Sequence, residues 1–437
     1  MDQQLAQTLD WLYSLEARGE IYKLERMDRA LELIGNPHRR LSAVHIAGTK
    51  GKGSVAAMLD GVLRAAGYKT GLYTKPHLVH LSERTRVSGG EMPARQMLYY
   101  IERLRAIYDH AALALTFFEF TVALMFLYFA ESRVDIAVIE TGLGGRLDST
   151  NVVLPMLSVI TPIGFDHMEY LGYTIASIAA EKGGIIKQGI PVVIGARSGD
   201  ARAVLTSIAE QRGAAVRMID RDFSYHSHTP AHRIDYHGLG MALDSVALGV
   251  AGPFQHENAA IALAAVESLR VQGWRVPDEA VRSGLQNLSW PGRFDIVSRN
   301  PTVVLDCAHN QLSIEALLET VRVELGEGVR PRLVFGCLAD KQYSKMAEML
   351  RARVRDVTLT RVKPKRPLEP EVLVPLFAPH VSTRVIKEPQ EAIERVLLEA
   401  GTDDIVLVTG SVYLIGEVYS YFLARDGRRG LFPEAMA

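Results

Sequence analysis

The sequence predicts an α/β fold with two domains, each built on a mainly parallel β-sheet. Short apolar runs of strand length alternate with segments that have apolar residues at helical spacing, which is typical of a parallel sheet covered by helices. A glycine-rich turn at residues 47–54 joins one such strand to the next helix. A Pro-Gly-Arg-Phe sequence at residues 291–294 is followed by a second, separate alternation of strands and helices.

The first part of the chain begins with a helix over residues 4–18, where leucines recur at helical spacing. The run at residues 135–139 is almost entirely apolar, as expected for a strand that is covered on both faces. Further strands are expected at residues 41–47, 70–73, 157–160 and 192–194, and further helices at residues 55–66, 118–130 and 259–269.

Residues 224–240 differ from the rest, because they carry four histidines and show no helical period. A solvent-exposed hairpin is the favoured interpretation. A metal cluster is the alternative, although no cysteine and no pair of carboxylates in the segment would complete a ligand set. The four histidines are His226, His228, His232 and His237.

The second part of the chain is a complete α/β alternation of its own. Strands are expected at residues 302–305, 332–335, 357–360, 381–386 and 405–408, and helices at residues 313–323, 344–350, 371–377, 390–398 and 412–422. We therefore predict a larger N-terminal domain of residues 1–294 and a smaller C-terminal domain of residues 298–437.

Composition limits the class of protein. The chain has 437 residues, of which 48% are hydrophobic and 23% are charged, which is typical of a soluble globular protein. The formal net charge of −1 argues against a dedicated nucleic-acid binder. The longest apolar run, at residues 120–130, is too short to span a membrane. Cys307 and Cys337 lie in apolar, strand-like runs, so we expect them to be buried, inert thiols. With no signal-peptide pattern at the first residues, we expect a cytoplasmic protein.

The sequence AGTKGKGS at residues 47–54 is the clearest chemical signal. Glycines let a loop wrap around phosphate oxygens, and the start of the following helix adds unpaired N–H donors. Lys52 would reach the β- and γ-phosphates, and Ser54 would ligate Mg²⁺ or phosphate. This loop does not match the strict phosphate-loop pattern, because an extra glycine stands between Lys52 and Ser54. A tight strand-to-helix turn is therefore the alternative. The predicted nucleotide-binding residues are Gly48, Thr49, Lys50, Gly51, Lys52, Gly53, Ser54 and Val55.

Glu140 ends an apolar strand and precedes a glycine-rich turn. Ligands bind at the carboxyl ends of parallel strands, so a carboxylate there would hold Mg²⁺ beside the phosphate loop. A helix N-cap or a solvated strand end is the alternative. The glycines at residues 142–145 lack the third glycine of a dinucleotide fingerprint, which excludes a nicotinamide site.

The loop resembles that of the Mur-ligase superfamily of ATP-dependent amide ligases, and the whole chain resembles the folylpolyglutamate synthase/dihydrofolate synthase family. The resemblance is collinear over nearly the entire sequence. It implies an N-terminal ATPase domain and a C-terminal Rossmann-like domain, with the active site in the cleft between them. The matching segments are residues 24–27, 48–54, 76–78, 83–84, 118–119, 140–151, 166–167, 181–182, 291–294, 306–310, 340–341 and 410–411.

The resemblance implies a metal site and a set of catalytic residues. His167 would be a second metal contact, and Lys182 aligns with a carbamylated lysine that helps to hold metal. The implied metal ligands are Ser54, Glu140, His167 and, if carbamylated, Lys182. ATP and one or two Mg²⁺ ions would be the cofactors, with K⁺ as a further candidate.

Lys75 departs from the family pattern, which usually has a metal-contacting serine before the Pro-His-Leu segment. An ammonium group cannot ligate Mg²⁺, but it can act as a fixed positive charge near the γ-phosphate. We therefore predict that Lys75 takes over part of the charge role of one metal ion and belongs with Lys52, Glu140, His167 and Lys182 in the catalytic set.

Substrate contacts also follow from the resemblance. Asn258 would bind adenine, Arg293 would contact phosphate, and Asp306 would hold nucleotide from the second domain, with a helix N-cap as the alternative for Asp306. His309 and Ser411 would bind the carboxylates of the incoming amino acid. The implied acceptor contacts, which could equally be core packing at a helix start, are Leu24, Thr116, Phe117, Phe118, Glu119, Leu147 and Asp148.

The implied reaction joins L-glutamate to dihydropteroate or a reduced folate through an acyl phosphate, with ATP converted to ADP and phosphate. The resemblance also implies a monomer with small-molecule partners and no nucleic-acid or membrane partner. Two alternatives remain open: a Mur-type ligase with another acceptor, and a nucleotide-binding regulatory protein that has lost the chemistry. The sequence leaves open whether the enzyme forms dihydrofolate, extends polyglutamate tails, or does both.

Overall fold

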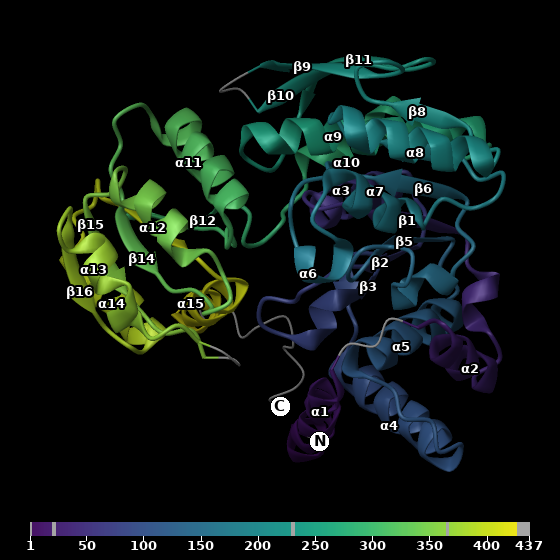
Figure 1. Cartoon of the computed structure of the whole chain (residues 1–437), viewed down its shortest axis with the longest axis horizontal. Coiled ribbons are helices and arrows are strands. Elements are labelled where there is room, and N and C mark those ends of the chain that lie inside the picture. The colour runs from purple at the N-terminus through teal and green to yellow at the C-terminus, as the bar shows by residue number, and fades with distance from the viewer. Residues whose placement is uncertain (1, 20–22, 229–231, 364–366, 426–437) are drawn as a thin grey trace.

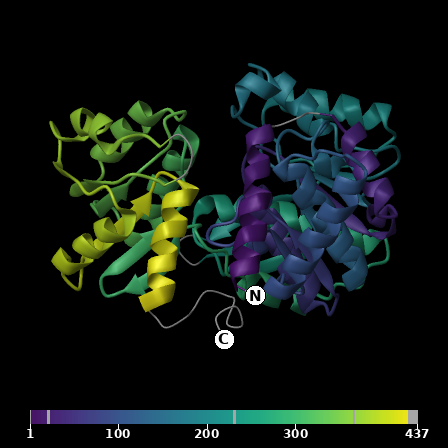
Figure 2. The ribbon, with the colours of Figure 1, turned by 90° about the horizontal axis from the view of Figure 1, so that it is seen from below.

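The computed structural model describes residues 2–19, 23–228, 232–363 and 367–425 (Figure 1). Two α/β bodies lie beside each other, one coloured purple to teal and the other green to yellow (Figures 1 and 2). The described residues include no helix long and apolar enough to cross a membrane. The predicted α/β class with mainly parallel sheets is confirmed.

The first body contains an eight-stranded sheet in the order β4-β3-β2-β5-β1-β6-β7-β8. Its strands pair in parallel except at one edge, where β3 and β4 run antiparallel. Ile46 pairs with Glu140 on one side and with Val159 on the other, so three strands end together where the phosphate loop begins. The strands are β1 (Ala43–Ala47), β2 (Thr70–Tyr73), β3 (Thr85–Val87), β4 (Gly90–Glu91), β5 (Ile136–Glu140), β6 (Leu157–Ile160), β7 (Val192–Ile194) and β8 (Val216–Met218).

Helices cover both faces of this sheet, so neighbouring residues of one strand enter different cores. On β5, Val138 packs with α3, α9 and α10, whereas Ala137 and Ile139 pack with α1, α2, α4 and α5. A third cluster joins β7 to α7 and α8. These helices are α1 (Asp2–Ser14), α2 (Glu25–Leu33), α3 (Lys52–Ala65), α4 (Ala94–His110), α5 (Phe117–Ser132), α6 (Met168–Leu171), α7 (Ile175–Gly183), α8 (Gly199–Gln211), α9 (Pro253–Val271) and α10 (Asp278–Gln286).

The histidine-rich segment forms the predicted hairpin, which belongs to a separate antiparallel sheet of β9 (Ser224–His228), β10 (Arg233–His237) and β11 (Ala242–Ala247). Ile234 and Tyr236 pack into the first core beneath it. Within the described part of the chain there is no group of three or more His, Cys, Asp or Glu side chains that could hold a metal ion. Residues 229–231, between β9 and β10, lie outside the described residues.

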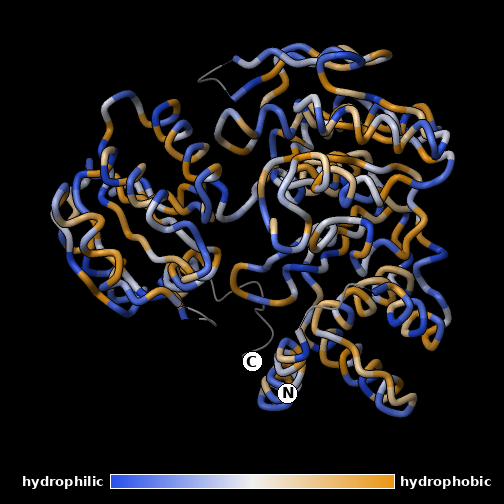
Figure 3. The backbone as a smooth tube through the Cα atoms, in the orientation of Figure 1, coloured by the Kyte–Doolittle hydropathy of each residue, from blue (hydrophilic) through white to orange (hydrophobic). Residues whose placement is uncertain are grey.

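The second body has a six-stranded sheet in the order β12-β13-β17-β14-β15-β16, parallel except for β12. Its two faces form two cores, and the hydrophobic segments follow the strands in both bodies (Figure 3). Both cysteines are free and buried there. The elements are β12 (Asp295–Arg299), β13 (Thr302–Leu305), α11 (Gln311–Leu325), β14 (Arg332–Phe335), α12 (Tyr343–Arg351), β15 (Asp356–Leu359), α13 (Val374–Phe377), β16 (Ser382–Val385), α14 (Pro389–Glu399), β17 (Ile405–Thr409) and α15 (Val412–Arg425).

Several predicted helices have different bounds in the structure. The helix expected over residues 259–269 begins at Pro253, and the one expected over residues 4–18 is α-helical only as far as Ser14. The helix expected from residue 55 begins at Lys52, because Gly51 takes the N-cap position with a φ of 80°. The helix expected over residues 371–377 is divided into a 3-10 turn, η5 (Pro370–Val372), and α13. Pro375 has no N–H with which to continue an α-helix from residue 371. The remaining 3-10 turns are η1 (Leu15–Arg18), η2 (Pro37–Arg40), η3 (Leu81–Arg84) and η4 (Ser149–Val152).

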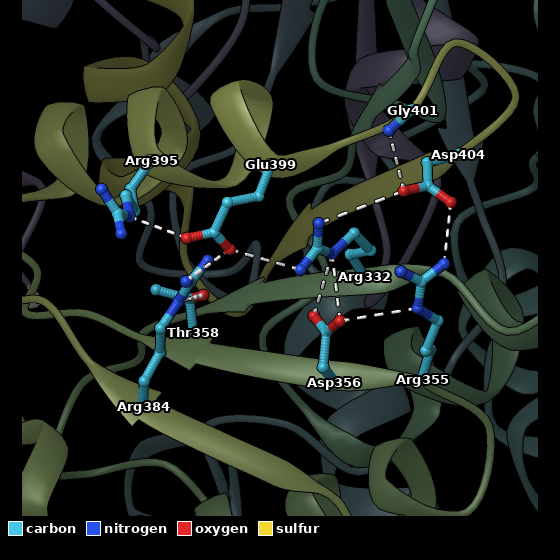
Figure 4. A network of polar contacts seen from close by, with 9 residues as sticks. All are labelled: Arg332, Arg355, Asp356, Thr358, Arg384, Arg395, Glu399, Gly401 and Asp404. Carbon is cyan, nitrogen blue, oxygen red and sulfur yellow. Dashed lines mark hydrogen bonds and ion pairs between the residues drawn. The ribbon is translucent and has the colours of Figure 1, made fainter.

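A network of ion pairs lies at one end of the second sheet, where β14 and β15 begin (Figure 4). Arg332, whose side chain is 11% exposed, contacts Asp356 at 3.0 Å, Glu399 at 3.5 Å and Asp404 at 4.0 Å. Arg355 also binds Asp404, at 2.8 Å. The network lies at the amino ends of the strands, so we expect it to stabilise the domain without taking part in catalysis.

Arg332→Met should lower the free energy of unfolding by about 2 kcal/mol, because it leaves partly buried carboxylates without their shared cation. Urea denaturation measures this change. Arg395→Met is the matched control, because Arg395 is 61% exposed and contacts only the outer side of Glu399 in this network. The prediction fails if both variants lose the same stability. ATP binding should be unchanged in both.

Candidate active site

Two glycines shape the loop between β1 and α3, because neighbouring side chains leave no room for a Cβ atom. A Cβ on Gly48, where φ is 153°, would lie 1.8 Å from Thr161 Oγ1. A Cβ on Gly51 would lie 2.1 Å from Asn258 Oδ1. The predicted adenine-binding residue Asn258, on α9, therefore lies against the phosphate loop.

The first amides of the loop are not directed toward a phosphate. The Thr49 and Lys50 N–H groups both donate to the carbonyl of Pro162, at 3.0 and 3.3 Å, and Thr49 Oγ1 donates to the Gly164 carbonyl at 3.0 Å. The first turn of α3 supplies the remaining donors, because helix N–H groups there have no acceptor within the helix. No side chain among the described residues caps this helix end.

Lys52 and Glu140 face each other at the carboxyl edge of the sheet. Lys52 Nζ donates to the Gly48 carbonyl at 3.0 Å and lies 4.0 Å from Glu140 Oε1. Glu140 is 4% exposed, and its Oε2 accepts the Lys75 N–H at 3.2 Å. Burial raises the pKa of Glu140, and the charges of Lys52 and Lys75 oppose that rise. The alternative of a solvated strand end for Glu140 is wrong, because the side chain is buried.

Lys182 and His167 approach the same loop from other elements. Lys182, on α7, is 4% exposed, and its Nζ donates to the Gly48 carbonyl at 2.7 Å. Burial and the nearby charge of Lys52 lower the pKa of Lys182 well below the ordinary lysine value, which favours the neutral amine. His167, just before α6, is more open, and burial lowers its pKa, which favours the neutral imidazole.

Phe118 and Asp148 meet over Gly142, in the turn that follows β5. A Cβ on Gly142 would lie 2.3 Å from Phe118 Cζ and 2.8 Å from Asp148 Oδ2. Burial raises the pKa of Asp148, and hydrogen bonds from Thr150 and Leu143 oppose that rise. A flat ring beside a buried carboxylate is suited to bind a heterocycle with N–H donors on its edge.

The other predicted acceptor residues make structural contacts. Thr116 caps α5, and its N–H and Oγ1 both lie 2.8 Å from Glu119 Oε2. Arg26 Nε donates to the other oxygen of Glu119 at 3.1 Å, so this carboxylate is held on both sides. Phe117 stacks on Tyr13, with ring centroids 5.5 Å apart. Two further acceptor candidates are Leu24, which precedes α2, and Leu147, which is half-buried.

The second domain contributes residues that face this edge. Asp306 follows β13, and its carboxylate accepts the N–H groups of Phe294 at 2.9 Å and Ala308 at 2.8 Å. The alternative role of Asp306 as a helix N-cap is wrong, because Asn310 caps α11. The positive charge of Arg293 opposes the rise that burial causes in the pKa values of Glu140, in the first domain, and Asp306, in the second.

The predicted amino-acid contacts lie on the same side of the second sheet. His309 Nδ1 lies 2.8 Å from the Cys307 carbonyl oxygen, and burial lowers the pKa of this histidine. Ser411 is 3% exposed, and its Oγ accepts the Tyr413 N–H at 3.2 Å. Both residues follow strands that end toward the first domain.

The residues that link the domains were not predicted as such from the sequence. Leu78 packs into a core of the second domain, and a Cβ on Gly416 of α15 would lie 2.0 Å from the Leu78 carbonyl oxygen. Trp290 lies against the phosphate loop, 3.4 Å from a Cβ placed on Gly53. Trp290 directly precedes the Pro-Gly-Arg-Phe boundary, which was the only sequence signal for it.

Two family models match these two domains. The Mur ligase middle domain matches residues 46–266, and the Mur ligase glutamate ligase domain matches residues 292–412. The dihydrofolate synthase/folylpolyglutamate synthase of Bacillus subtilis is 34% identical over 93% of this chain and 96% of its own length. The chain belongs to the folylpolyglutamate synthase/dihydrofolate synthase family. This family consists of ATP-dependent ligases that form amide bonds, and the chain is an enzyme of that class.

Solved structures of family members have the same fold. A folylpolyglutamate synthase from Thermotoga maritima is 35% identical, with a TM-score of 0.86 over 96% of this chain and 97% of that one. Escherichia coli FolC in complex with DHPP and ADP is 30% identical, with a TM-score of 0.86 over 97% of this chain and 98% of that one. These similarities cover both domains described above.

The donor atoms at this edge fit Mg²⁺, the metal that the family implies. Glu140 and Ser54 offer oxygen ligands, which Mg²⁺ prefers, and Mg²⁺ usually takes only one or two carboxylates together with substrate phosphates. The described residues hold no group of three or more acidic, histidine or cysteine side chains that could hold a metal ion.

Gly142→Ala should raise the KM for the acceptor about five- to a hundredfold, because overpacking such a contact typically costs about 1–3 kcal/mol. The added methyl group would push Phe118 away from Asp148. The KM for ATP should stay within twofold. Gly199→Ala is the control, because nothing lies within 4 Å of a Cβ there. Equal acceptor KM values for the two variants would disprove the placement of the acceptor.

Proposed function

We propose that the protein uses ATP to join L-glutamate to the carboxylate of dihydropteroate or a reduced folate. The main support is the grouping of Lys52, Glu140 and Asp148 at one sheet edge, with Lys52 Nζ 4.0 Å from the Glu140 carboxylate. Phosphate, metal and acceptor chemistry can therefore meet at one point. The names of the relatives support the same substrates.

The proposed reaction has two steps. The acceptor carboxylate attacks the γ-phosphorus of ATP, forming an acyl phosphate and releasing ADP. The amine of L-glutamate then attacks the acyl carbon, the C–O bond to phosphate breaks, and the departing phosphate can take the amine proton. Lys52 and Arg293 would offset the charge on the transferring phosphoryl group, which is mainly positioning and electrostatics. Contact between the domains would exclude water from the acyl phosphate.

The substrates would be held by residues from both domains. We assign the adenine to Asn258, a phosphate to Arg293, the nucleotide also to Asp306, and the glutamate carboxylates to His309 and Ser411. The family resemblance suggests a monomer, so we propose a monomer that acts on small molecules only. Analytical ultracentrifugation tests the monomer, and a dimer at working concentration would disprove it.

We propose that Glu140, Ser54, His167 and a carbamylated Lys182 hold Mg²⁺, which would supply positive charge to the phosphates when bound. A neutral amine is the form that reacts with CO₂, and the lowered pKa of the buried Lys182 supports this modification. Mass spectrometry of the intact protein in bicarbonate should find one added CO₂, which Lys182→Met should lack. A wild-type protein without the added CO₂, or a Lys182→Met protein that still carries it, would contradict the modification.

Lys75 would act as a fixed charge beside the metal site. Its ammonium group acts on Glu140, Asp148 and Lys182, which supports a position among them. Lys75→Ser should make nucleotide binding more dependent on Mg²⁺, because the variant loses a permanent cation. Calorimetric titration of ADP at several Mg²⁺ concentrations measures this dependence. An unchanged Mg²⁺ dependence would count against the charge role of Lys75.

The proposed activity is tested by ATP-dependent incorporation of radiolabelled glutamate into dihydropteroate and into tetrahydrofolate. We expect incorporation with at least one of the two, and one ADP released for each glutamate joined. Comparison of the acceptors separates dihydrofolate formation from tail extension. Glutamate incorporation into neither acceptor would contradict the proposal.

A further inference from the structure

A buried chain of hydrogen bonds runs from β1 to the acceptor side of the site. His45, in the middle of β1, is 0% exposed, and its Nε2 lies 2.8 Å from Thr150 Oγ1. Thr150, in η4, is also 0% exposed, and its Oγ1 and N–H lie 2.5 and 3.0 Å from Asp148 Oδ1. Neither His45 nor Thr150 was predicted to be a site residue.

The direction of each bond in this chain follows from the carboxylate. Asp148 in its ionised form can only accept, so the Thr150 hydroxyl donates to Oδ1 and must accept from His45. This assignment makes His45 the neutral tautomer with its proton on Nε2. His45 Nδ1 is buried without a hydrogen-bond partner among the described residues. In the other neutral tautomer, the proton on Nδ1 would therefore have no acceptor. Burial lowers the pKa of His45 to about 3, which keeps the ring neutral at working pH.

Counting the hydrogen bonds among the described residues, one acceptor position on Asp148 stays open. Both acceptor positions of Oδ1 are taken by Thr150. Oδ2 accepts the Leu143 N–H at 2.7 Å, which leaves one of its two positions. Oδ2 is also the oxygen that lies beside Gly142, where the Phe118 ring packs. The open position is therefore on the oxygen beside Gly142 and Phe118, where the proposed function puts the acceptor.

We propose that His45 and Thr150 are positioning residues that hold Asp148 with only Oδ2 available to the acceptor. Asp148 then selects acceptors whose flat ring presents an N–H donor on its edge and stacks beside Phe118. This inference rests on the proposed function for the acceptor, and it adds a specificity device that begins on the strand before the phosphate loop. Strand β1 thus contains the histidine that positions Asp148, and it leads directly into the loop that binds ATP.

The first test compares Thr150→Val with Thr150→Ser. Valine has a similar shape but neither donates to Asp148 nor accepts from His45, whereas serine keeps both bonds. Thr150→Val should weaken dihydropteroate binding about ten- to a hundredfold, the usual effect of losing a buried hydrogen bond to a charged group, and Thr150→Ser should stay within about threefold. ADP binding should change by less than twofold in both. A folded Thr150→Val with unchanged dihydropteroate affinity would overturn the proposal.

The second test addresses His45 and does not depend on the acceptor. NMR of ¹⁵N-labelled histidine should show the Nε2–H tautomer for His45 in the wild type and a changed signal in Thr150→Val. His45→Gln keeps a donor for Thr150 and should bind dihydropteroate more tightly than His45→Leu. A wild type without the Nε2–H tautomer would overturn the hydrogen-bond chain. A wild type with that tautomer but no binding of any pteridine would overturn the proposed function and the selection role together.

Discussion

Lys52→Ala should lower kcat about 10²- to 10³-fold, the usual effect of removing a group that stabilises charge in a transition state. Lys52 Nζ lies within the phosphate loop, 3.0 Å from the Gly48 carbonyl and 4.0 Å from Glu140. Lys182 Nζ also donates to the Gly48 carbonyl, at 2.7 Å, but of these two lysines it is Lys52 that lies in the loop itself and faces Glu140. Steady-state rates of ADP release, together with calorimetric ATP binding, measure the effect.

Lys50→Ala is the matched control for this prediction, since it removes the same charge from the same loop. Burial lowers the pKa of Lys50 to about 8, and its backbone N–H is already bonded to Pro162. We expect Lys50→Ala to lose less than tenfold in kcat. If Lys52→Ala keeps more than a tenth of the wild-type rate, the assignment of Lys52 to the transferring phosphate is wrong.

Glu140→Gln should lower kcat about a hundredfold and raise the Mg²⁺ concentration needed for half-maximal nucleotide binding. Glutamine keeps the shape of the side chain and removes the negative charge that faces Lys52 and Lys75. Without that charge the site attracts a divalent cation less strongly, because Lys52 and Lys75 remain beside it. Mg²⁺ titrations of ADP binding separate this effect from a loss of folding.

Glu181→Gln provides the comparison for Glu140→Gln. Glu181 lies next to Lys182 in the sequence and pairs with Arg146 at 2.8 Å. Its change should leave rate and Mg²⁺ dependence within about twofold. Similar Mg²⁺ curves for Glu140→Gln and the wild type would contradict the metal role of Glu140.

Much of the architecture could be predicted, because it rests on local patterns. The β1–loop–α3 unit has a strand pattern, a glycine-rich turn and a helix pattern in immediate succession. The parallel sheets follow from the alternation of such units. Helix α4 was not predicted although its signal is present: Met97, Tyr100, Ile101, Leu104 and Tyr108 are buried at helical spacing. The short edge strands β3 and β4 carry too few apolar residues to be recognised.

The site could be predicted only in part. The position of Glu140 beside the loop follows from the rule that strand ends gather ligands at one edge. The direction of the Thr49 and Lys50 amides could not be foreseen, because their acceptor, Pro162, is more than a hundred residues away. The contact of His45 with Thr150 also joins distant segments. Such contacts depend on how the strands pair, which no local pattern encodes.

In the proposed reaction, the acceptor carboxylate takes the γ-phosphoryl group of ATP before glutamate is joined. An acceptor labelled with ¹⁸O in its carboxylate tests this step. Each turnover should transfer one labelled oxygen to the released phosphate, because the C–O bond of the acyl phosphate breaks when the amine attacks. Phosphate released without label, while the amide product forms at the normal rate, would contradict the account.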